Sequence, residues 1–585
     1  MTTRSKNGIF KKKAFVASAA CDLNAIEPSS YKKAMEIPVW KQAMQEEFDA
    51  LTNQGTWSLV PPQADKNVVS CKWIFKVKKN SDGSISRQKA RLVARGFSQE
   101  EGIDYDETFS PVVRHTTVRL VLAMAAQFGW KLHQLDVKNT FLHGILKEEV
   151  YMSQPPGFED PRCPTHVCKL QKSLYGLKQA PRAWNERFTS FLPQLGFKCS
   201  IADPSLFIKS SGPSQVYLLL YVDDIILTGN SASAIQYVKD ALKKEFEMKD
   251  LGLLHYFLGL QITYLLDGGL FISQAKYAKD ILDKAGMTDC NASITPCLPY
   301  SKLLKDEGAP FKDVKTYRSI VGCLQYLTFT RPDIAYSVNS VCQFMQNPTK
   351  VHFLAVKRIL RYIKGTLNYG ITFRAAPLEL RAYTDSDWAG DPNDRRSTTG
   401  FVIFLGNCPI SWSSRKQTSV SRSSTEAEYR AMADTASEVL WLRHLLNDLH
   451  VKLPSAPTLH CDNVSALALA SNPIHNSKVK HVEVDVHFTR EKVARGELAL
   501  QFVPSLQQLA DILTKGLDSP QFKYLCSNLM LGSLHQFEGG CKDYSDCQDG
   551  QGSQVLRVSK ATDVATKADT CDDKTGYQEL VTITN

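Results

Sequence analysis

Two adjacent aspartates interrupt a long apolar run in this chain. The run reads YLLLYVDDIILTG over residues 217–229, and the pair is Asp223 and Asp224. Two apolar segments on either side of a polar pair predict two strands joined by a tight turn. Burying neighbouring carboxylates is unfavourable, through desolvation and mutual repulsion, unless a cation or a solvated turn compensates them. The run therefore predicts a hairpin whose tip is either a metal site or a plain polar turn, since Asp is common in hairpin turns.

Length and composition narrow the class of protein. A chain of 585 residues with a 43% apolar share is too long for a single core and too apolar to be disordered throughout, so we expect two to four domains. The net charge of +10 permits a polyanionic partner without requiring one. The 15 cysteines show no paired C-x-x-C ligand sets, which favours reduced structural thiols.

The chain also lacks the signals of a membrane or secreted protein. No apolar segment approaches the roughly 20 residues that span a bilayer. The start, MTTRSKNGIFKKK, lacks the apolar core of a secretory signal. We therefore expect a soluble intracellular protein with no membrane partner.

Residues 68–97 concentrate positive charge in a predicted two-stranded ribbon. CKWIFKVKK and ISRQKARLVARGF alternate around a turn at 81–83, and Asp82 is the only acid among them. Such a ribbon suits phosphate groups, although a solvated charged hairpin would have the same text. Its basic residues are Lys72, Lys76, Lys78, Lys79, Arg87, Lys89, Arg91 and Arg95.

The elements around the aspartate pair predict a compact α+β sheet domain. A helix over 117–128 precedes the strand KLHQLDV, which ends near Asp136. We expect further helices over 170–184 and 234–246. If the strand of Asp136 neighbours the hairpin, the three carboxylates could bridge two metal ions about 3.5–4 Å apart.

A second folded region is predicted farther along the chain. Helices over 277–285, 317–329 and 352–366 lead to a β-rich region that begins near Leu380. That region contains strands, a long helix and the strand-to-helix text LQFVPSLQQLADILTKGL. The last 50 or so residues are rich in Ser, Asp, Gln and Gly, and we expect them to be disordered.

Five motifs, in order, resemble the reverse transcriptase of copia-type LTR retrotransposons. They are KARLVARGFSQEEGIDYDETFSPV, QLDVKNTFLHG, SLYGLKQAPRAW, LLLYVDDIILTG and FLGLQI. The resemblance covers about residues 36–520 and implies an α+β right-hand polymerase with fingers, palm and thumb, followed by an α/β ribonuclease H-like domain with a mixed sheet. The implied domains are a flexible segment (1–36), fingers and palm (37–265), thumb and connection (266–378), the ribonuclease H-like domain (379–520) and a disordered tail (521–585).

The resemblance also implies the residues of a polymerase site. Asp136 and Asp223 resemble the two principal metal ligands of the palm, with Asp224 beside them. Phe141 falls at the steric gate that favours deoxynucleotides, although it also fits an ordinary core Phe. Lys78, Lys89 and Arg91 are candidates for holding the triphosphate, and Tyr175, Gly176 and Lys178 match the segment that packs on the incoming nucleotide and template base.

Two positions depart from the family pattern. Thr140 stands in place of Ala beside the gate, where it could crowd the sugar, and Ile145 stands where an acid often follows the Gly. FLGLQI, residues 257–262, resembles the primer grip and otherwise reads as a plain strand.

A second carboxylate set resembles that of ribonuclease H. Its members are Asp385 in AYTDSDWAG, Glu428 in STEAEYRAMA, Asp462 in LHCDNVSAL and Asp511 in the opening of a predicted last helix. Glu428 is preferred to Glu426 because E-Y-x-A matches the family's helix text. Asp387 is expected to be a solvated surface acid.

The implied function is an RNA-directed DNA polymerase that also degrades the copied RNA. It implies Mg²⁺ or Mn²⁺, two ions per active site. The partners would be an RNA template, a DNA primer, an RNA–DNA hybrid and deoxynucleoside triphosphates, with integrase, protease and capsid supplied elsewhere. The location would be cytoplasmic, within virus-like particles if the element is active, or nuclear. The alternatives are an inactive or co-opted remnant that binds nucleic acid, and ribonuclease activity alone.

Overall fold

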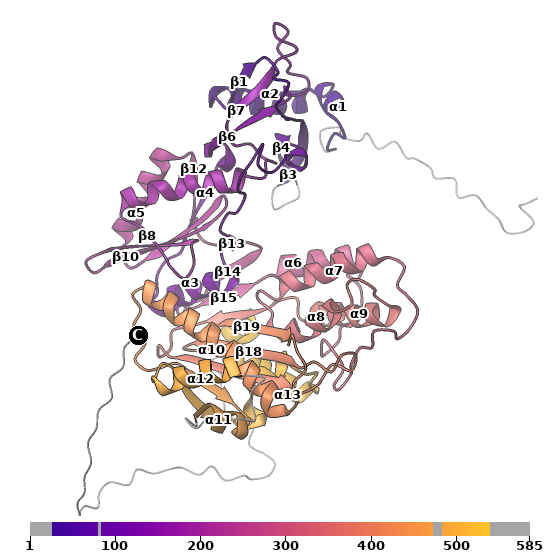
Figure 1. Cartoon of the computed structure of the whole chain (residues 1–585), viewed down its shortest axis with the longest axis vertical. Helices are drawn as coiled ribbons and strands as arrows, with labels where there is room; N and C mark the ends of the chain where they lie inside the picture. The colour runs from indigo at the N-terminus through magenta and orange to yellow at the C-terminus, as the bar shows by residue number, and fades with distance from the viewer. Residues whose placement is uncertain (1–25, 80–83, 472–482, 539–585) are drawn as a thin grey trace, which may run out of the picture. The chain divides into compact units, whose positions relative to one another are not determined.

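A computed structural model describes residues 26–538, apart from 80–83 and 472–482. These described residues belong to one compact unit that ends at Glu538 (Figure 1). Within these ranges, none of the helices combines the length and apolar character that a membrane crossing requires. The described cysteines are free thiols, as expected.

The N-terminal elements form a four-stranded sheet (β1-β7-β6-β2) and a separate two-stranded ribbon (β3-β4). The ribbon is antiparallel and pairs Lys76 with Lys89, which confirms the predicted basic hairpin. Trp40, Met44 and Leu51 are buried on one side of α2, at the spacing of a helix face. The elements are α1 (Tyr31–Met35), α2 (Pro38–Asn53), β1 (Trp57–Val60), β2 (Val68–Val69), β3 (Cys71–Lys79), β4 (Ile85–Ala94), η3 (Gly96–Ser98), β6 (Ile145–Met152) and β7 (Val167–Lys172).

The next sheet has six antiparallel strands in the order β12-β5-β11-β10-β9-β8. Alternation along β10 divides its side chains between two cores: Leu218 and Leu220 pack with α4 and α5, whereas Leu219 packs with α3. The elements are α3 (His115–Phe128), β5 (His133–Val137), η4 (Thr140–His143), α4 (Ala180–Phe191), η5 (Leu192–Leu195), β8 (Lys198–Cys199), β9 (Leu206–Ser211), β10 (Ser214–Tyr221), β11 (Asp224–Gly229), α5 (Ala232–Glu245) and β12 (Met248–Leu253). The sheet confirms that the strand of Asp136 neighbours the aspartate hairpin.

A third sheet, β13-β14-β15-β16-β22, joins distant parts of the chain. Its last strand comes from the C-terminal end of the described residues and pairs Leu531 with Ile371. The three helices predicted in this region are present as α6, α7 and α9. The elements are β13 (Tyr256–Phe257), β14 (Leu260–Tyr264), β15 (Leu270–Ser273), α6 (Ala275–Lys284), α7 (Val314–Leu327), η6 (Pro332–Ile334), α8 (Ala335–Cys342), α9 (Lys350–Gly365), β16 (Tyr369–Phe373) and β22 (Leu531–Ser533).

The last sheet is mixed, with the order β19-β18-β17-β20-β21. β17, β18 and β19 are antiparallel, whereas β20 and β21 run parallel to β17. The long helix α10 contacts β17 and β18 (Figure 1). The elements are β17 (Leu380–Asp387), β18 (Thr398–Leu405), β19 (Cys408–Lys416), α10 (Ser424–Asp448), β20 (Thr458–Cys461), α11 (Val464–Ser471), α12 (Glu483–Ala494), β21 (Ala499–Phe502), η8 (Ser505–Gln507), η9 (Leu509–Leu513), α13 (Ser519–Asn528) and α14 (Leu534–Glu538).

The expected helix over 170–184 is wrong in its first half. β7 continues to Lys172, and α4 begins only at Ala180. Between them, Gly176 adopts φ +94° with its carbonyl accepting from Gly96 N, 3.1 Å away. A Cβ at this glycine would lie 2.1 Å from the carbonyl oxygen of Ala94, so the close contact with β4 requires glycine and breaks the helix.

Both segments that we expected to be flexible include residues that form helices or strands. Residues 31–35 form α1, although they fell in the segment expected to be flexible. Residues 521–538, assigned to the tail, contain most of α13 together with β22 and α14. The burial of Phe522, Leu525 and Leu529 explains the difference, because these apolar residues lie on one face of α13. Residues 1–25 and 539–585 of these two segments lie outside the described residues.

We predict that truncation after residue 538 leaves the fold intact, whereas truncation after residue 520 destabilises it. The shorter chain loses the buried side chains of Phe522, Leu525, Leu529 and Leu531. At about 1.5–3 kcal/mol for each buried side chain, the loss is roughly 6–12 kcal/mol. Thermal unfolding and limited proteolysis of the two truncated proteins measure the difference, and equal melting of both would contradict it.

Candidate functional site

The hairpin turn that carries the aspartate pair is held by two hydrogen bonds to its carbonyl groups. Trp184 Nε1 donates to the carbonyl of Val222, 2.7 Å away, and Val137 N donates to the carbonyl of Asp223, 2.9 Å away. Val222 adopts φ +51°, a conformation that a β-branched residue avoids unless its surroundings impose it. The two bonds therefore fix a strained turn and, with it, the position of Asp223.

Strand pairing then sets Asp224 beside Asp136. The two residues are register partners across β11 and β5, a position at which Cβ atoms lie about 4.5–5.5 Å apart. Gln134 Nε2 donates to Asp224 Oδ1 at 3.0 Å, which orients that carboxylate. The structure thus brings together the three acids that the sequence singled out.

The electrostatics of this cluster favour a bound cation. Burial, together with the charges of Asp223 and Asp136, raises the pKa of Asp224 to about 6. Burial and Asp223 also raise the pKa of Asp136, although the charges of Lys89 and Lys249 oppose the rise. A divalent ion would relieve this repulsion, and carboxylate oxygens are the ligands that Mg²⁺ and Mn²⁺ prefer. The donor set therefore fits the implied ions.

Four of the predicted substrate residues lie near these acids. The Arg91 guanidinium lies over the Tyr175 ring at 4.3 Å, and the edge of that ring meets Phe141 at 4.8 Å. The charges of Lys89 and Arg91 both act on Asp136, and those of Asp223 and Asp136 act on Tyr175. The basic ribbon and the carboxylates therefore share one electrostatic environment.

The other predicted substrate residues have structural contacts. Lys178 Nζ donates to the carbonyl of Gln99 at 3.1 Å and to the Tyr105 hydroxyl at 3.0 Å. Gly176 makes the close backbone contact described above, and Lys78 is exposed on β3 opposite Arg87. For these three positions the contacts are those of a loop brace, a tight turn and a surface charge.

Thr140, which precedes Phe141, directs its hydroxyl to the backbone. Its side chain is buried, and its hydroxyl donates to the carbonyl of Val137 at 2.9 Å. The hydroxyl is thus satisfied by backbone within the η4 turn. Ile145 is exposed at the start of β6.

The four acids of the second set also converge. Asp385 lies in β17, Glu428 near the start of α10, Asp462 directly after β20 and Asp511 in η9. Glu428 Oε1 accepts from the backbone N of Ser386 at 3.2 Å, next to Asp385. Glu426, the rejected alternative, pairs instead with Arg430 at 3.0 Å.

Burial without full compensation perturbs this second cluster strongly. Burial, with the charges of Asp385 and Asp462, raises the pKa of Glu428 to about 10. Burial and Asp385 also raise the pKa of Asp511 to about 7, against the opposing charge of Lys515. The ligand atoms of Glu428, Cys461 and Asp462 lie within 4.8 Å of one another, a spacing that suits a metal ion. The two carboxylates fit the implied ions, whereas the Cys461 thiol, whose pKa is raised by burial and by the charge of Glu428, is not a ligand that Mg²⁺ or Mn²⁺ prefers.

The segment that carries Asp511 is a 3-10 turn and does not open the predicted helix. Gln508 Nε2 donates to the carbonyl of Thr384 at 2.9 Å, which ties the chain to β17. A Cβ on Gly400 would lie 2.6 Å from Thr514 Cγ2, so η9 packs directly on β18. These tertiary contacts override the local helical pattern and bring Asp511 to Asp385.

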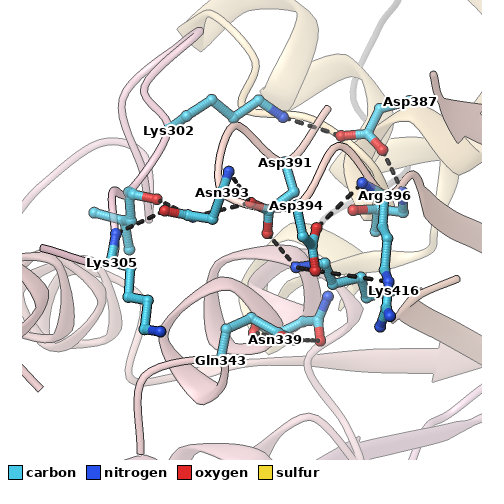
Figure 2. A network of polar contacts seen from close by, with 12 residues as sticks. Lys302, Lys305, Asn339, Gln343, Asp387, Asp391, Asn393, Asp394, Arg396 and Lys416 are labelled. Atoms are coloured by element: carbon cyan, nitrogen blue, oxygen red, sulfur yellow. Dashed lines mark hydrogen bonds and ion pairs between the residues drawn. The ribbon is translucent and has the colours of Figure 1, made fainter. Parts of the chain in front are cut away.

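Asp387 is not the solvated acid that we expected. Its Oδ2 accepts from Lys302 Nζ at 3.0 Å, and its Oδ1 accepts from the backbone N of Thr398 (Figure 2). Nearby, Lys416 Nζ lies 2.5 Å from Asp391 Oδ2 and 2.9 Å from Asp394 Oδ2, and Figure 2 shows its side chain between these two aspartates. Asp387 is therefore a structural residue that pairs with Lys302, and it does not belong to the cluster of four acids.

The sequence reading missed several residues that shape the two clusters. Trp184 and Gln134 act through contacts between elements, for which the sequence carries no local signal. Cys461 directly precedes Asp462, and Lys515 follows Asp511 by four residues, the spacing of a helical ion pair. Closeness in sequence to a predicted ligand was the signal that could have identified Cys461 and Lys515.

Comparisons with known proteins agree with the motifs. A family model described as "Reverse transcriptase (RNA-dependent DNA polymerase)" matches residues 54–299. The Retrovirus-related Pol polyprotein from transposon RE1 of Arabidopsis thaliana is 47% identical over 531 residues, which is 90% of this chain and 36% of that protein. A putative transposon Ty5-1 protein of Saccharomyces cerevisiae is 33% identical over its whole length and 52% of this chain.

The two Arabidopsis Pol polyproteins match most of this chain, but the chain spans only about a third of their own length. Among solved structures, the prototype foamy virus protease-reverse transcriptase aligns with 84% of this chain and 78% of its own. Its sequence identity to this chain is 11% and the TM-score is 0.25.

We predict that Asp224→Asn stabilises the metal-free protein at neutral pH. The folded pKa of about 6 lies above the ordinary 3.8, so the folded state holds the proton more tightly than the unfolded state. That stabilisation is complete below the ordinary pKa and is lost as the pH rises through the folded value. At neutral pH the ionised carboxylate therefore destabilises the fold, and neutral Asn removes the penalty.

Thermal unfolding in chelator tests this at about pH 7.5 and about pH 5, on either side of the folded pKa. The variant should melt higher than wild type at the upper pH, and the gain should shrink at the lower. Asp240→Asn, an exposed aspartate on α5, should give no such difference. A loss of stability at the upper pH would contradict the prediction.

Proposed function

This chain belongs to the family of copia-type retrotransposon Pol polyproteins, and on that premise we propose that it is an RNA-directed DNA polymerase with a C-terminal ribonuclease H domain. It would extend a DNA primer along an RNA template, using deoxynucleoside triphosphates, and degrade the RNA of the hybrid. The proposal takes residues 37–265 as fingers and palm, 266–378 as thumb and connection, and 379–520 as the ribonuclease domain.

The observation that carries the polymerase proposal is the pairing of Asp224 with Asp136 beside the fixed turn of Asp223. In the proposal these three carboxylates hold two Mg²⁺ or Mn²⁺ ions. Bound there, the ions would activate the primer hydroxyl and neutralise the charge that develops on the transferred phosphate. The role of the chain is to hold its acids at one point of a rigid sheet, which supplies positioning and excludes wrong geometries.

The basic ribbon would bind the nucleotide. Lys89 and Arg91 are the best-supported triphosphate ligands, because their charges already act on Asp136. Phe141 would contact the sugar, backed by Tyr175. Lys78, Gly176 and Lys178 complete the proposed substrate set; the contacts of Lys178 suit a residue that braces the loop over 99–105.

The convergence of Asp385, Glu428, Asp462 and Asp511 supports the ribonuclease part of the proposal. The raised pKa values of Glu428 and Asp511 indicate that the protein alone compensates these carboxylates incompletely. Hydrolysis of RNA would leave a 3′-hydroxyl end.

The family setting supports the remaining partners. Integrase, protease and capsid proteins would be supplied elsewhere, and the protein would act in the cytoplasm, in virus-like particles, or in the nucleus. The alternative function is a nucleic-acid-binding remnant without turnover. The departures at Thr140 and Ile145 motivated it, but the buried and bonded hydroxyl of Thr140 now weakens that argument.

We predict that the protein extends a primer on an RNA template with Mg²⁺ or Mn²⁺ and that Asp223→Asn abolishes extension. Losing several kcal/mol of metal-assisted stabilisation should cost about a thousandfold or more in rate. Asp240→Asn, on the exposed face of α5, is the matched control and should extend normally. Template–primer binding without extension by the wild type would favour the remnant.

A second prediction concerns the ribonuclease site. Glu428→Gln should abolish cleavage of RNA in a hybrid, again by about a thousandfold. Glu426→Gln, two residues away in the same helix, should retain cleavage because Glu426 pairs with Arg430. A hybrid with labelled RNA measures both variants, and the opposite pattern would reverse the assignment of the two glutamates.

A further inference from the structure

Lys515 supplies a positive charge at one edge of the second carboxylate cluster. Its Nζ lies 2.8 Å from Asp511 Oδ1 and 3.7 Å from Asp385 Oδ2. The Lys515 side chain is 42% exposed, whereas those of Asp511 and Asp385 are 9% and 5% exposed. A partly exposed ammonium thus reaches from the surface between two buried carboxylates.

The opposite edge of the cluster has no such partner. Among the residues that the structure describes, Glu428 and Asp462 form no ion pair; Glu428 accepts from the backbone N of Ser386, and Asp462 accepts from the Ser505 hydroxyl at 2.7 Å. The Thr514 hydroxyl donates to Asp385 Oδ2, so the occupied edge is further satisfied by a neutral donor. Ion pairing within the cluster is therefore one-sided, although the charge of Lys515 also acts on Glu428 and Asp462 from farther away.

This one-sidedness bears on how two metal ions could bind. The two-ion arrangement requires ions about 3.5–4 Å apart that share carboxylates. An ammonium between Asp385 and Asp511 competes for the same oxygens and repels a divalent cation at that distance. An ion shared by Asp385 and Asp511 would meet the Lys515 ammonium directly, whereas an ion held by Glu428 and Asp462 would not.

We propose that Lys515 is a built-in counter-charge that stands in for one of the two divalent ions. It stabilises Asp385 and Asp511 in the metal-free protein and makes the two ion positions unequal. Glu428 and Asp462 would hold the first ion with Lys515 in place, and Asp385 and Asp511 would be free to hold a second only when the Lys515 ammonium has rotated into solvent. Lys515 is thus a positioning residue, and the effect on cleavage, though not on ion binding, rests on the proposed ribonuclease function.

The side chain can leave without moving the backbone. Lys515 N donates to the carbonyl of Asp511 at 3.1 Å, which anchors the main chain at the end of η9. The contact with the carboxylates is therefore made by the flexible side chain alone. Its rotation to solvent breaks two ion pairs and no backbone hydrogen bond.

The test uses the full-length protein and the variants Lys515→Met, Lys515→Arg and Lys416→Met. Lys416 is the matched control, because it also bridges two aspartates in the same sheet region, as Figure 2 shows, but lies outside the four-acid cluster. Thermal unfolding is followed in chelator and across a Mn²⁺ titration, and direct Mn²⁺ binding is measured for each protein.

In chelator, Lys515→Met should melt below wild type, and Lys515→Arg, which keeps the charge, should not. Saturating Mn²⁺ should restore Lys515→Met to the wild-type melting temperature or above it, but should not restore Lys416→Met. The weaker Mn²⁺ site should tighten by about tenfold in Lys515→Met, since removing one nearby positive charge is worth at least that much.

Two outcomes would overturn the proposal: an unchanged Mn²⁺ isotherm in Lys515→Met, or equal restoration of Lys416→Met by Mn²⁺. Failure of the ribonuclease function itself is distinguishable. It would appear as wild-type Mn²⁺ binding without cleavage of the hybrid, and the comparison of binding between variants would still stand.

Discussion

Two hydrogen bonds to the carbonyl groups of Val222 and Asp223 fix the point on which the first candidate site depends. One donor is an indole from α4 and the other is a backbone amide of β5, so a helix and a strand hold the turn from separate directions. The positive φ of Val222 is tolerated because these contacts impose it. Pairing in β5 and β11 then carries the precision of the turn to Asp136 and Asp224. The position of the three carboxylates thus depends on the backbone of the turn, which contacts with α4 and β5 hold in place.

Incomplete charge compensation unites the two candidate sites. Each contains two carboxylates whose pKa values burial raises, Asp136 and Asp224 in the first and Glu428 and Asp511 in the second, which is unfavourable for the metal-free fold and favourable for a divalent ion. The sites differ in how the chain handles the metal-free state. In the first cluster the charges of Lys89 and Lys249 oppose the rise in the pKa of Asp136, whereas Lys515 enters the second cluster and pairs with two of its acids. Lys515 therefore stabilises the metal-free form of the second site by direct ion pairs, whereas the first site has no lysine or arginine in an ion pair with its acids among the described residues.

The elements that were predicted well share strong local patterns. The apolar run around Asp223 and Asp224, the basic hairpin and the helices α3, α5 and α7 all follow from periodicity and turn residues. The failures occur where distant contacts decide. Residues around Gly176 are not helical, because the backbone of this glycine packs closely against β4. The chain around Asp511 forms the 3-10 turn η9 because Gln508 and Thr514 donate hydrogen bonds to residues of β17. The predicted disordered tail began too early in the chain, because the prediction followed the polar composition and overlooked the helical spacing of Phe522, Leu525 and Leu529.

The sequence by itself determined which chemistry is available. It supplied the acids in order, the basic ribbon and the family motifs, because residue type and spacing are written directly in the chain. Only the tertiary structure decided which acids meet and what surrounds them. The pairing of Asp136 with Asp224, the exclusion of Asp387 and Glu426 from the second cluster, and the position of Lys515 all depend on contacts between residues far apart in the chain or on the exact direction of a side chain. Such contacts are selected by the packing of the whole fold, which balances many weak interactions and leaves no mark on any single segment.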